Sequence, residues 1–283
     1  MINGRDAHTD VVMFWNLHEA GIDRLYGDNR RWHLQRDLIS ALRPRVLMTT
    51  EGWAWHFGEE AYFKDAKAAL GMDGALFTAK TGCNMAIFWE PGARVVAVEP
   101  SRPDLSAWHG HGSVTLHLPG WSHPLRFAVA HLDPFSPVNR LIESDRLRQF
   151  AAPDTTTVLA MDANTVPPGD LEPDWTALPR HRRADHLMPG DKHADRAPLQ
   201  RLLGDPDDPL FIDAGAHTGD RRPTYGLHPP GDAARRSDVF LLSPSLVGSL
   251  ESYQPVDDAR LAPSGGTPAA SDHVPITLRL RRR

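Results

Sequence analysis

The 283-residue sequence contains a single cysteine, Cys83. One cysteine excludes an internal disulfide framework and a cysteine-rich zinc site. Long hydrophobic runs are missing too, since no uninterrupted apolar stretch approaches the roughly 18–20 residues that span a bilayer. Residues 1–10 are polar and lack the apolar segment of a signal peptide. These absences predict a cytoplasmic protein without a membrane span.

Basic residues are outnumbered by acidic ones, 31 to 36. The formal net charge of −5 argues against a broadly basic surface that holds nucleic acid non-specifically, and leaves room only for a local basic groove. Histidine is frequent, with 15 residues, of which His109 and His111 stand in a Gly-rich turn and are expected to be exposed. A hydrophobic content of 41% is ordinary for a globular protein, and the length suits one large α/β domain over residues 1–283.

Apolar runs alternate with amphipathic stretches along the chain, which predicts an α/β protein. Helices are expected at 30–42, 59–70, 139–150 and 197–203. Strands are expected at 10–17, 46–49, 75–78, 85–89, 94–98, 113–118, 125–131, 156–161, 210–213, 237–242, 247–253 and 274–280. Many strands with few helices between them predict two sheets packed together with helices outside.

Residues 165–208 differ from the rest, because they are rich in Pro, Asp, Arg and His. They have too few apolar residues for a core of their own, which predicts a long loop excursion and not a separate domain. Long loops of this kind often border an active site in α/β proteins.

The segment Ser271-Asp272-His273 precedes the last expected strand and places a carboxylate beside an imidazole. Such a pair can bind a metal ion, accept a proton or stabilise a phosphate, but alone it is more often part of a turn than of a site. It gains weight because polar residues recur at the ends of the other expected strands. These are Asn16, Glu51, His131, Asp162 with Asn164, and Asp238 just before residues 239–242.

Three residues of this set suit a divalent cation. Mg²⁺ prefers oxygen ligands, commonly one or two carboxylates with several waters retained. Glu51 is therefore the best ligand candidate, and Asp272 and Asn16 are expected beside it.

The other residues suit attack on phosphorus. Asp162 can orient or deprotonate a water molecule, and Asn164 can donate a hydrogen bond to a phosphoryl oxygen. His273 held by Asp238 would be a charge-stabilised imidazole at the scissile phosphate, or would transfer a proton. His131 would supply a second donor. This set predicts a metal-assisted in-line attack, in which positioning and charge stabilisation do most of the work.

The order of the motifs resembles the endonuclease/exonuclease/phosphatase superfamily. The motifs are Trp15-Asn16, Thr50-Glu51, Ala130-His131-Leu132, Met161-Asp162-Ala163-Asn164, Arg236-Ser237-Asp238-Val239-Phe240 and Ser271-Asp272-His273. Each motif is short, but all six occur in the right order across residues 10–280. Thr224-Tyr225 also stands where the family often has a threonine followed by an aromatic residue. The superfamily includes DNase I-like nucleases, abasic-site endonucleases, sphingomyelinases, inositol-polyphosphate 5-phosphatases and deadenylases.

The resemblance implies a four-layer α/β sandwich, with two mainly antiparallel sheets packed face to face and helices outside. It also implies hydrolysis of phosphoesters with Mg²⁺ or Mn²⁺. Carried over by position, it implies Asn16 and Glu51 at the metal, Asp162 and Asn164 at the nucleophile and phosphate, Asp238 paired with His273, and His131 and Asp272 completing the pocket.

Two positions depart from the family pattern. Residues 47–50 read Leu-Met-Thr-Thr where the family usually shows an apolar residue followed by Gln, and Met161 stands where it usually has Gly. Neither change removes a chemical group.

The substrate depends on basic and aromatic side chains around the site. Candidates for a nucleic-acid groove are Arg140, Arg146, Arg148, residues 180–183, and Arg221 with Arg222, and each of them can instead be a solvated arginine. Trp53 and Trp55 can stack on a base or sugar, or can pack in the core.

We therefore expect a phosphodiesterase or nuclease that acts on nucleic acid. The alternative is a phosphatase or phosphodiesterase for a small phosphorylated metabolite or lipid head group, in keeping with the acidic overall charge. A third hypothesis, a binding module without catalysis, is weakened because every chemical group is present. No feature of the sequence assigns an oligomeric state.

Overall fold

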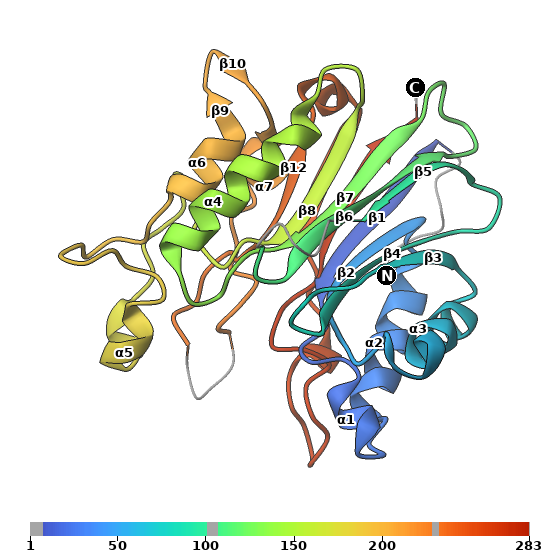
Figure 1. The fold of residues 1–283 in the computed structure, drawn as a ribbon, viewed down its shortest axis with the longest axis horizontal. Helices are drawn as coiled ribbons and strands as arrows, with labels where there is room; N and C mark the ends of the chain where they lie inside the picture. Colours follow the sequence, from blue (N-terminus) through green and yellow to red (C-terminus); the bar gives the residue numbers. More distant parts are fainter. Residues whose placement is uncertain (1–7, 101–106, 228–231, 283) are drawn as a thin grey trace.

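The computed structural model describes residues 8–100, 107–227 and 232–282. Its centre is a pair of six-stranded sheets (Figure 1). The strands of the first sheet, in spatial order, are β13 (Leu250–Pro255), β14 (Ile276–Arg281), β1 (Thr9–Asn16), β2 (Val46–Trp53), β4 (Cys83–Trp89) and β3 (Asp73–Phe77). Those of the second are β11 (Ile212–Asp213), β12 (Asp238–Leu242), β8 (Thr157–Asp162), β7 (Leu125–His131), β6 (Gly110–His117) and β5 (Arg94–Pro100).

Helices cover the outer faces of both sheets. The longer ones are α2 (Arg30–Leu42), α3 (Phe57–Leu70), α4 (Pro137–Leu147) and α6 (Ala197–Leu203). The short ones are α1 (Ile22–Leu25), α5 (Arg180–Arg183), α7 (Ala214–Thr218) and the 3₁₀ turns η1 (Arg148–Ala151), η2 (Trp175–Ala177), η3 (Pro244–Ser249) and η4 (Ala259–Leu261). A separate two-stranded ribbon joins β9 (Gly204–Asp205) to β10 (Asp208–Pro209).

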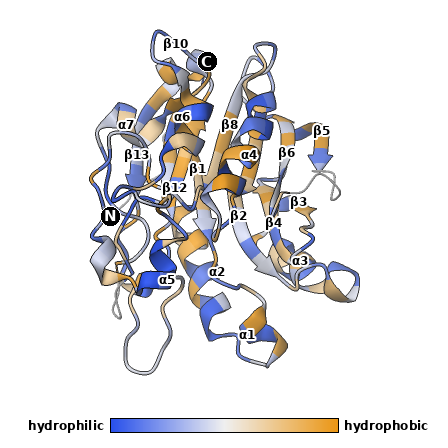
Figure 2. Ribbon diagram, turned by 60° about the vertical axis from the view of Figure 1, so that its left-hand side comes forward, coloured by the Kyte–Doolittle hydropathy of each residue, from blue (hydrophilic) through white to orange (hydrophobic). Residues whose placement is uncertain are grey.

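The molecule has four layers, with α4 and α6 beside the second sheet and α2 and α3 beside the first (Figure 1). The main core lies between the sheets, where Phe14 of β1 meets Phe240 of β12 edge to face at 6.5 Å. Separate apolar clusters pack each sheet against its own helices. Figure 2 shows the central strands as the most hydrophobic part of the molecule and α5 as hydrophilic. This arrangement confirms the predicted four-layer α/β sandwich.

Each sheet contains one parallel pair, β1 with β2 and β7 with β8, and its other pairs are antiparallel. A parallel pair needs a crossover, which α2 supplies in the first sheet and α4 in the second. The end of α2 follows from the sequence, because Pro44 cannot continue the helix and Arg43 takes a left-handed conformation at its C-cap. Helix α4 begins at Pro137, and the Ser136 hydroxyl accepts the Asn139 N–H as an N-cap.

These parallel pairs fix where the functional side chains emerge. The carboxyl ends of paired parallel strands lie at one edge of the sheet, so β1 and β2 deliver Asn16 and Glu51 together, and β7 and β8 deliver His131 opposite Asp162. A strand that is antiparallel to one of these strands begins at the edge where that strand ends. Asp238, the first residue of β12, is therefore paired with Asp162.

Most expected elements are present, and a few differ. The expected strand 247–253 is wrong in its first half, where the chain forms η3 and only then enters β13. Pro244 opens this turn and lacks the N–H that a strand ladder needs, and Leu246 reaches the core from the turn. The expected strand 210–213 shortens to the two residues of β11. Helix α7 was not expected; the Asp213 carboxylate caps it by accepting the N–H groups of Gly215 and Ala216.

The segment expected to be a loop excursion, 165–208, contains η2, α5 and α6. It is anchored by Asp170, whose carboxylate accepts two hydrogen bonds from the Arg236 guanidinium at 2.8 and 3.0 Å. The same guanidinium donates two more to Asp213, at 2.8 and 2.7 Å. The Arg236 side chain is fully buried and its partners nearly so. One buried cation thus joins the excursion, α7 and the start of β12.

No helix among the described residues is both long and apolar enough to cross a membrane.

The Arg236 network gives a prediction about stability. Arg236→Ala leaves the buried carboxylate of Asp213 without its cation and Asp170 with only the partly exposed Arg221, and should lower the free energy of unfolding by about 3–5 kcal/mol, measured by urea denaturation. The control is Arg201→Ala, which removes an ion pair with Asp145 whose side chains are half exposed. Its cost should stay below about 1 kcal/mol. Equal losses in the two variants would contradict the structural role of Arg236.

Candidate active site

The strand ends meet at a cavity of about 510 Å³. Six of the eight predicted site residues line it: Glu51, His131, Asp162, Asn164, Asp272 and His273. The other two, Asn16 and Asp238, lie behind the cavity wall and are fully buried. The structure therefore brings all eight residues together, two of them as supports.

The Asp162 carboxylate is the centre of this arrangement. Its Oδ2 atom accepts a hydrogen bond from Asn16 Nδ2 at 3.0 Å and lies 3.4 Å from His131 Nε2 and 3.7 Å from His273 Nε2. Its Oδ1 atom accepts the Ser237 hydroxyl at 2.6 Å and the Asn164 N–H at 3.0 Å. Burial would raise the pKa of Asp162, but the charges of His273 and His131 hold it well below its usual range. Asp162 is therefore ionised.

His273 is held on the other side by Asp238, with 2.8 Å between His273 Nδ1 and Asp238 Oδ2. The ring also packs against Tyr225, with the ring centres 4.6 Å apart. Burial lowers the pKa of His273, but the charges of Asp238 and Asp162 outweigh burial and raise it to about 10. An imidazolium between two carboxylates is the result.

Thr224 supports the Asp238 side of this pair. Its hydroxyl oxygen accepts the N–H groups of Ser237 and Asp238, each at 3.1 Å. The Thr224-Tyr225 element noted in the sequence thus contributes to the site twice, first through the backbone before β12 and then through the Tyr225 ring.

Glu51 lies at a bulge in β2, between residues 49 and 52, and has a left-handed backbone with φ of 61°. Its carboxylate accepts Asn16 Nδ2 at 3.0 Å and the Glu19 N–H at 2.8 Å. The Asn16 oxygen accepts the His18 N–H. Asn16 therefore orients Glu51 and Asp162 together through its amide nitrogen.

Asp272 also faces the cavity, and its Oδ1 atom lies 2.9 Å from His18 Nδ1. The preceding residue, Ser271, donates its hydroxyl to the Asn16 carbonyl at 2.7 Å and accepts the His273 N–H at 3.0 Å. The segment Ser271-Asp272-His273 is thus fixed to the end of β1 by its serine.

Around His131 the structure corrects one expectation. His109 was expected to be exposed, but it is 6% exposed and stacks on His131 with ring centres 4.2 Å apart. Its Nδ1 atom lies 2.9 Å from the Thr81 hydroxyl. Burial and the charge of His131 lower the pKa of His109 to about 2, so this ring is neutral. The hairpin register, Gly110 opposite His131, explains the stack, because it places the start of β6 beside the end of β7.

The cavity also has a cationic wall. Arg235 and Arg182 line it, and the Arg235 guanidinium lies over the Tyr225 ring at 4.5 Å. Arg182 belongs to the expected basic stretch 180–183, while Arg235 stands one residue before the Arg236-Ser237-Asp238 motif and was missed.

The other candidate arginines lie elsewhere. Arg140 is fully buried and donates to the carbonyls of Asp133 and Asp185, whereas Arg148, Arg221 and Arg222 pair with nearby aspartates. Trp53 lines the cavity, and Trp55 is a core residue packed on Phe63 and Phe88.

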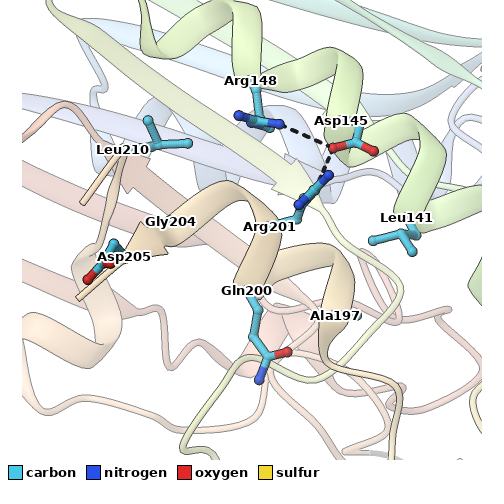
Figure 3. Close-up of a pocket in the computed structure, with 9 residues that line it drawn as sticks. All are labelled: Leu141, Asp145, Arg148, Ala197, Gln200, Arg201, Gly204, Asp205 and Leu210. Carbon is cyan, nitrogen blue, oxygen red and sulfur yellow. Dashed lines mark hydrogen bonds and ion pairs between the residues drawn. The ribbon is translucent and has the colours of Figure 1, made fainter. Parts of the chain in front are cut away.

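A larger hollow, of about 600 Å³, lies between α4 and α6 (Figure 3). Its acidic residue Asp145 is already paired with Arg148 and Arg201, and no predicted site residue reaches it. The residues that line the smaller cavity therefore make it the better candidate for the active site.

No protein-family model and no curated protein matches the sequence. The structure, however, matches solved structures over nearly its whole length. An endonuclease/exonuclease/phosphatase family protein from Bacteroides thetaiotaomicron is 16% identical and has a TM-score of 0.64, covering 97% of this chain and 95% of its own. The chain has the endonuclease/exonuclease/phosphatase fold. The family resemblance inferred from the motifs is confirmed at the level of the fold.

Two further structures with this fold carry more specific names. A humanized D. rerio TDP2 is 15% identical with a TM-score of 0.68, covering 96% of this chain and 99% of its own. A mannosyl-6-phosphatase from B. thetaiotaomicron is 16% identical with a TM-score of 0.64, covering 95% and 98%. This endonuclease/exonuclease/phosphatase fold therefore occurs in proteins with different names, and the substrate of this chain must be argued from its own cavity.

The donor set of the cavity fits a divalent cation. Glu51 and Asp272 present carboxylate oxygens to the cavity, the ligands that Mg²⁺ or Mn²⁺ prefers. Among the described residues, two buried groups also have ligand atoms within 4.8 Å of one another: Asp162 with Asp238 and His273, and Cys83 with His109 and His131. In the first group His273 Nδ1 already pairs with Asp238 Oδ2. Of this group, Asp162 and His273 line the cavity.

The thiol of Cys83 provides a check on this arrangement. Cys83 is 1% exposed, its Sγ atom lies 3.7 Å from His131 Nδ1, and burial raises its pKa. Because a buried thiol with a raised pKa reacts slowly, we expect 5,5′-dithiobis(2-nitrobenzoate) to modify the folded protein at least about 100-fold more slowly than the unfolded protein. The sequence has no other cysteine, so the signal is unambiguous. Rapid modification without unfolding would show that the His131 side of the cavity is open.

Proposed function

We propose that the protein is a divalent-metal-dependent phosphoester hydrolase whose substrate is nucleic acid or a related phosphodiester. The observation that carries the proposal is the ionised Asp162 carboxylate, which lies within 3.7 Å of two histidine nitrogens and shares Asn16 with Glu51. Such a set can hold a water molecule beside a bound phosphate.

In this proposal Asp162 orients the attacking water and accepts its proton as the water oxygen bonds to phosphorus. The bond from phosphorus to the leaving oxygen breaks in line with the attack. His273, held by Asp238, and His131 donate hydrogen bonds to the phosphoryl oxygens and offset the developing charge. The Asn164 amide donates one N–H to the Leu132 carbonyl, which leaves its second N–H for the phosphate.

Glu51 and Asp272 would hold the metal ion, with Asn16 next to it. A bound Mg²⁺ or Mn²⁺ supplies Lewis-acid polarisation of the phosphoryl oxygen. Asn16 donates its amide hydrogens to both the Glu51 and the Asp162 carboxylates, and so keeps the two carboxylates turned toward each other.

The cavity walls support an anionic substrate with a ring. The half-exposed Arg182 side chain adds positive charge to the lining, and Trp53 adds an aromatic ring. The small-phosphoester alternative keeps one point in its favour, since the cavity volume of about 510 Å³ suits a single small molecule. Both candidates share the same phosphate chemistry.

The direct test is hydrolysis of plasmid DNA, RNA and bis-4-nitrophenyl phosphate in the presence of Mg²⁺ or Mn²⁺. We expect turnover of at least one substrate, abolished by EDTA and restored by added metal. No turnover of any of them, with Glu51→Ala indistinguishable from the unmodified protein, would overturn the hydrolase assignment.

The catalytic roles give a second prediction. Asp162→Ala removes the proposed base and His273→Ala the proposed cation, so each should lower kcat by at least about 100-fold, the scale of general acid–base groups. Matched controls are Asp154→Ala and His217→Ala, both exposed, which should keep wild-type kcat. Near-normal turnover of either site variant would show that its role is misassigned.

Metal binding can be separated from turnover. Glu51→Gln keeps the shape of the side chain and one of the two hydrogen bonds that the carboxylate accepts, but removes the ligand charge, and should weaken Mn²⁺ binding by about 10- to 100-fold in isothermal titration calorimetry. Glu59→Gln, an exposed residue of α3, is the control. Unchanged Mn²⁺ affinity in Glu51→Gln would place the ion on other residues.

A further inference from the structure

Two aromatic side chains stand exposed at the cavity wall, and the proposed phosphate chemistry does not use them. Phe135 is 59% exposed and Trp108 is 37% exposed, and both line the cavity. Their ring centres are 5.8 Å apart with the planes at 85°. A planar ring placed against the pair can stack on one of them and meet the other edge on, the two geometries that aromatic rings prefer.

The pair is fixed in place by buried carboxylates. Glu143 of α4 is 4% exposed, and its two oxygens accept the N–H groups of Trp108 at 2.6 Å and Asp133 at 2.8 Å. The Asp133 carboxylate in turn accepts the Phe135 N–H at 2.7 Å. Two loops far apart in the sequence thus share one glutamate, which gives exposed rings a preorganised backbone.

The rings also connect to the phosphate chemistry. Trp108 contacts His109 with ring centres 6.4 Å apart, and His109 stacks on His131 at 4.2 Å. His131 lies 3.4 Å from the Asp162 carboxylate. Trp108 is therefore two ring contacts from His131. The Lys80 ammonium lies 5.9 Å from the Trp108 ring centre and adds positive charge there.

We propose that Trp108 and Phe135 form a subsite for the nucleobase of a nucleotide-type phosphoester, an inference that rests on the proposed hydrolase function. A nucleobase is planar and is separated from its phosphate by a sugar, which matches an aromatic corner set apart from the phosphate-binding floor. A lipid chain would need an apolar wall that continues beyond the pair. The cavity lining instead turns to His109, His186 and Arg182. A bare sugar phosphate would leave the rings uncovered.

The test compares two esters with the same leaving group, thymidine 5′-(4-nitrophenyl phosphate) and methyl 4-nitrophenyl phosphate, which differ by the nucleoside. Base stacking on an aromatic side chain raises affinity by about 5- to 150-fold. The kcat/KM of the unmodified protein should therefore be higher for the nucleoside ester by a factor in this range. Phe135→Ala and Trp108→Ala should each reduce this preference about 10-fold, through KM. Trp108→Phe keeps a ring and should retain most of it.

The aromatic control is Tyr26→Ala, since Tyr26 is 87% exposed and lies outside the cavity. It should leave the preference as in the unmodified protein. A binding measurement without turnover completes the design: calorimetry should give thymidine 5′-monophosphate a higher affinity than 2-deoxyribose 5-phosphate, and Phe135→Ala should remove the difference.

The outcomes separate the two proposals. If neither ester is hydrolysed, calorimetry alone decides whether the base is bound, and the hydrolase function is overturned only if plasmid DNA, RNA and bis-4-nitrophenyl phosphate also remain intact. If both esters are hydrolysed and the ratio of their kcat/KM values is the same in every variant, the nucleobase subsite is overturned while the hydrolase stands. The same conclusion follows if thymidine 5′-monophosphate and 2-deoxyribose 5-phosphate bind equally to the unmodified protein.

Discussion

The buried carboxylate of Asp162 is the constraint on which the rest of the site depends. An ionised carboxylate that is 1% exposed is costly unless charges and hydrogen bonds surround it. Its partners come from the end of β1, the end of β7, the residue before β12 and the segment before β14. Each of these segments must reach one point for the fold to tolerate the charge. Folding and assembly of the site are therefore one event.

The sequence could predict these strand ends because the relevant signals are local. Arg30–Leu42 has helical periodicity and a proline after it, and Leu125–His131 is mostly apolar, so both were predicted with the bounds observed. A polar residue that follows such a run shows where the strand ends, and parallel pairing then brings the ends to one edge. Pro244–Ser249 failed this reasoning, because its apolar residues reach the core from a turn.

The walls of the cavity could not be predicted in the same way. His109 was expected to be exposed, because no neighbour in sequence indicates that it stacks on His131; only the β6–β7 register does. Arg235, Trp108 and Phe135 stand in loops whose positions depend on contacts with distant residues, such as His186 for Arg235 and Glu143 for Trp108. The residues proposed to act on the phosphate could thus be recognised in the sequence, whereas those proposed to recognise the rest of the substrate could not.

The division of the site between the two sheets has a consequence for how the protein would fail. Asn16 and Glu51 belong to the first sheet, and His131, Asp162 and Asp238 to the second, and side-chain packing such as Phe14 on Phe240 must hold the sheets in register for their hydrogen bonds to form. A slide of one sheet over the other by a fraction of a side chain would separate the hydrogen bonds from Asn16 to Asp162 while leaving each sheet's ladder whole. Packing between the sheets therefore aligns the candidate active site. A core substitution far from the cavity can abolish the proposed activity without changing any residue of the site.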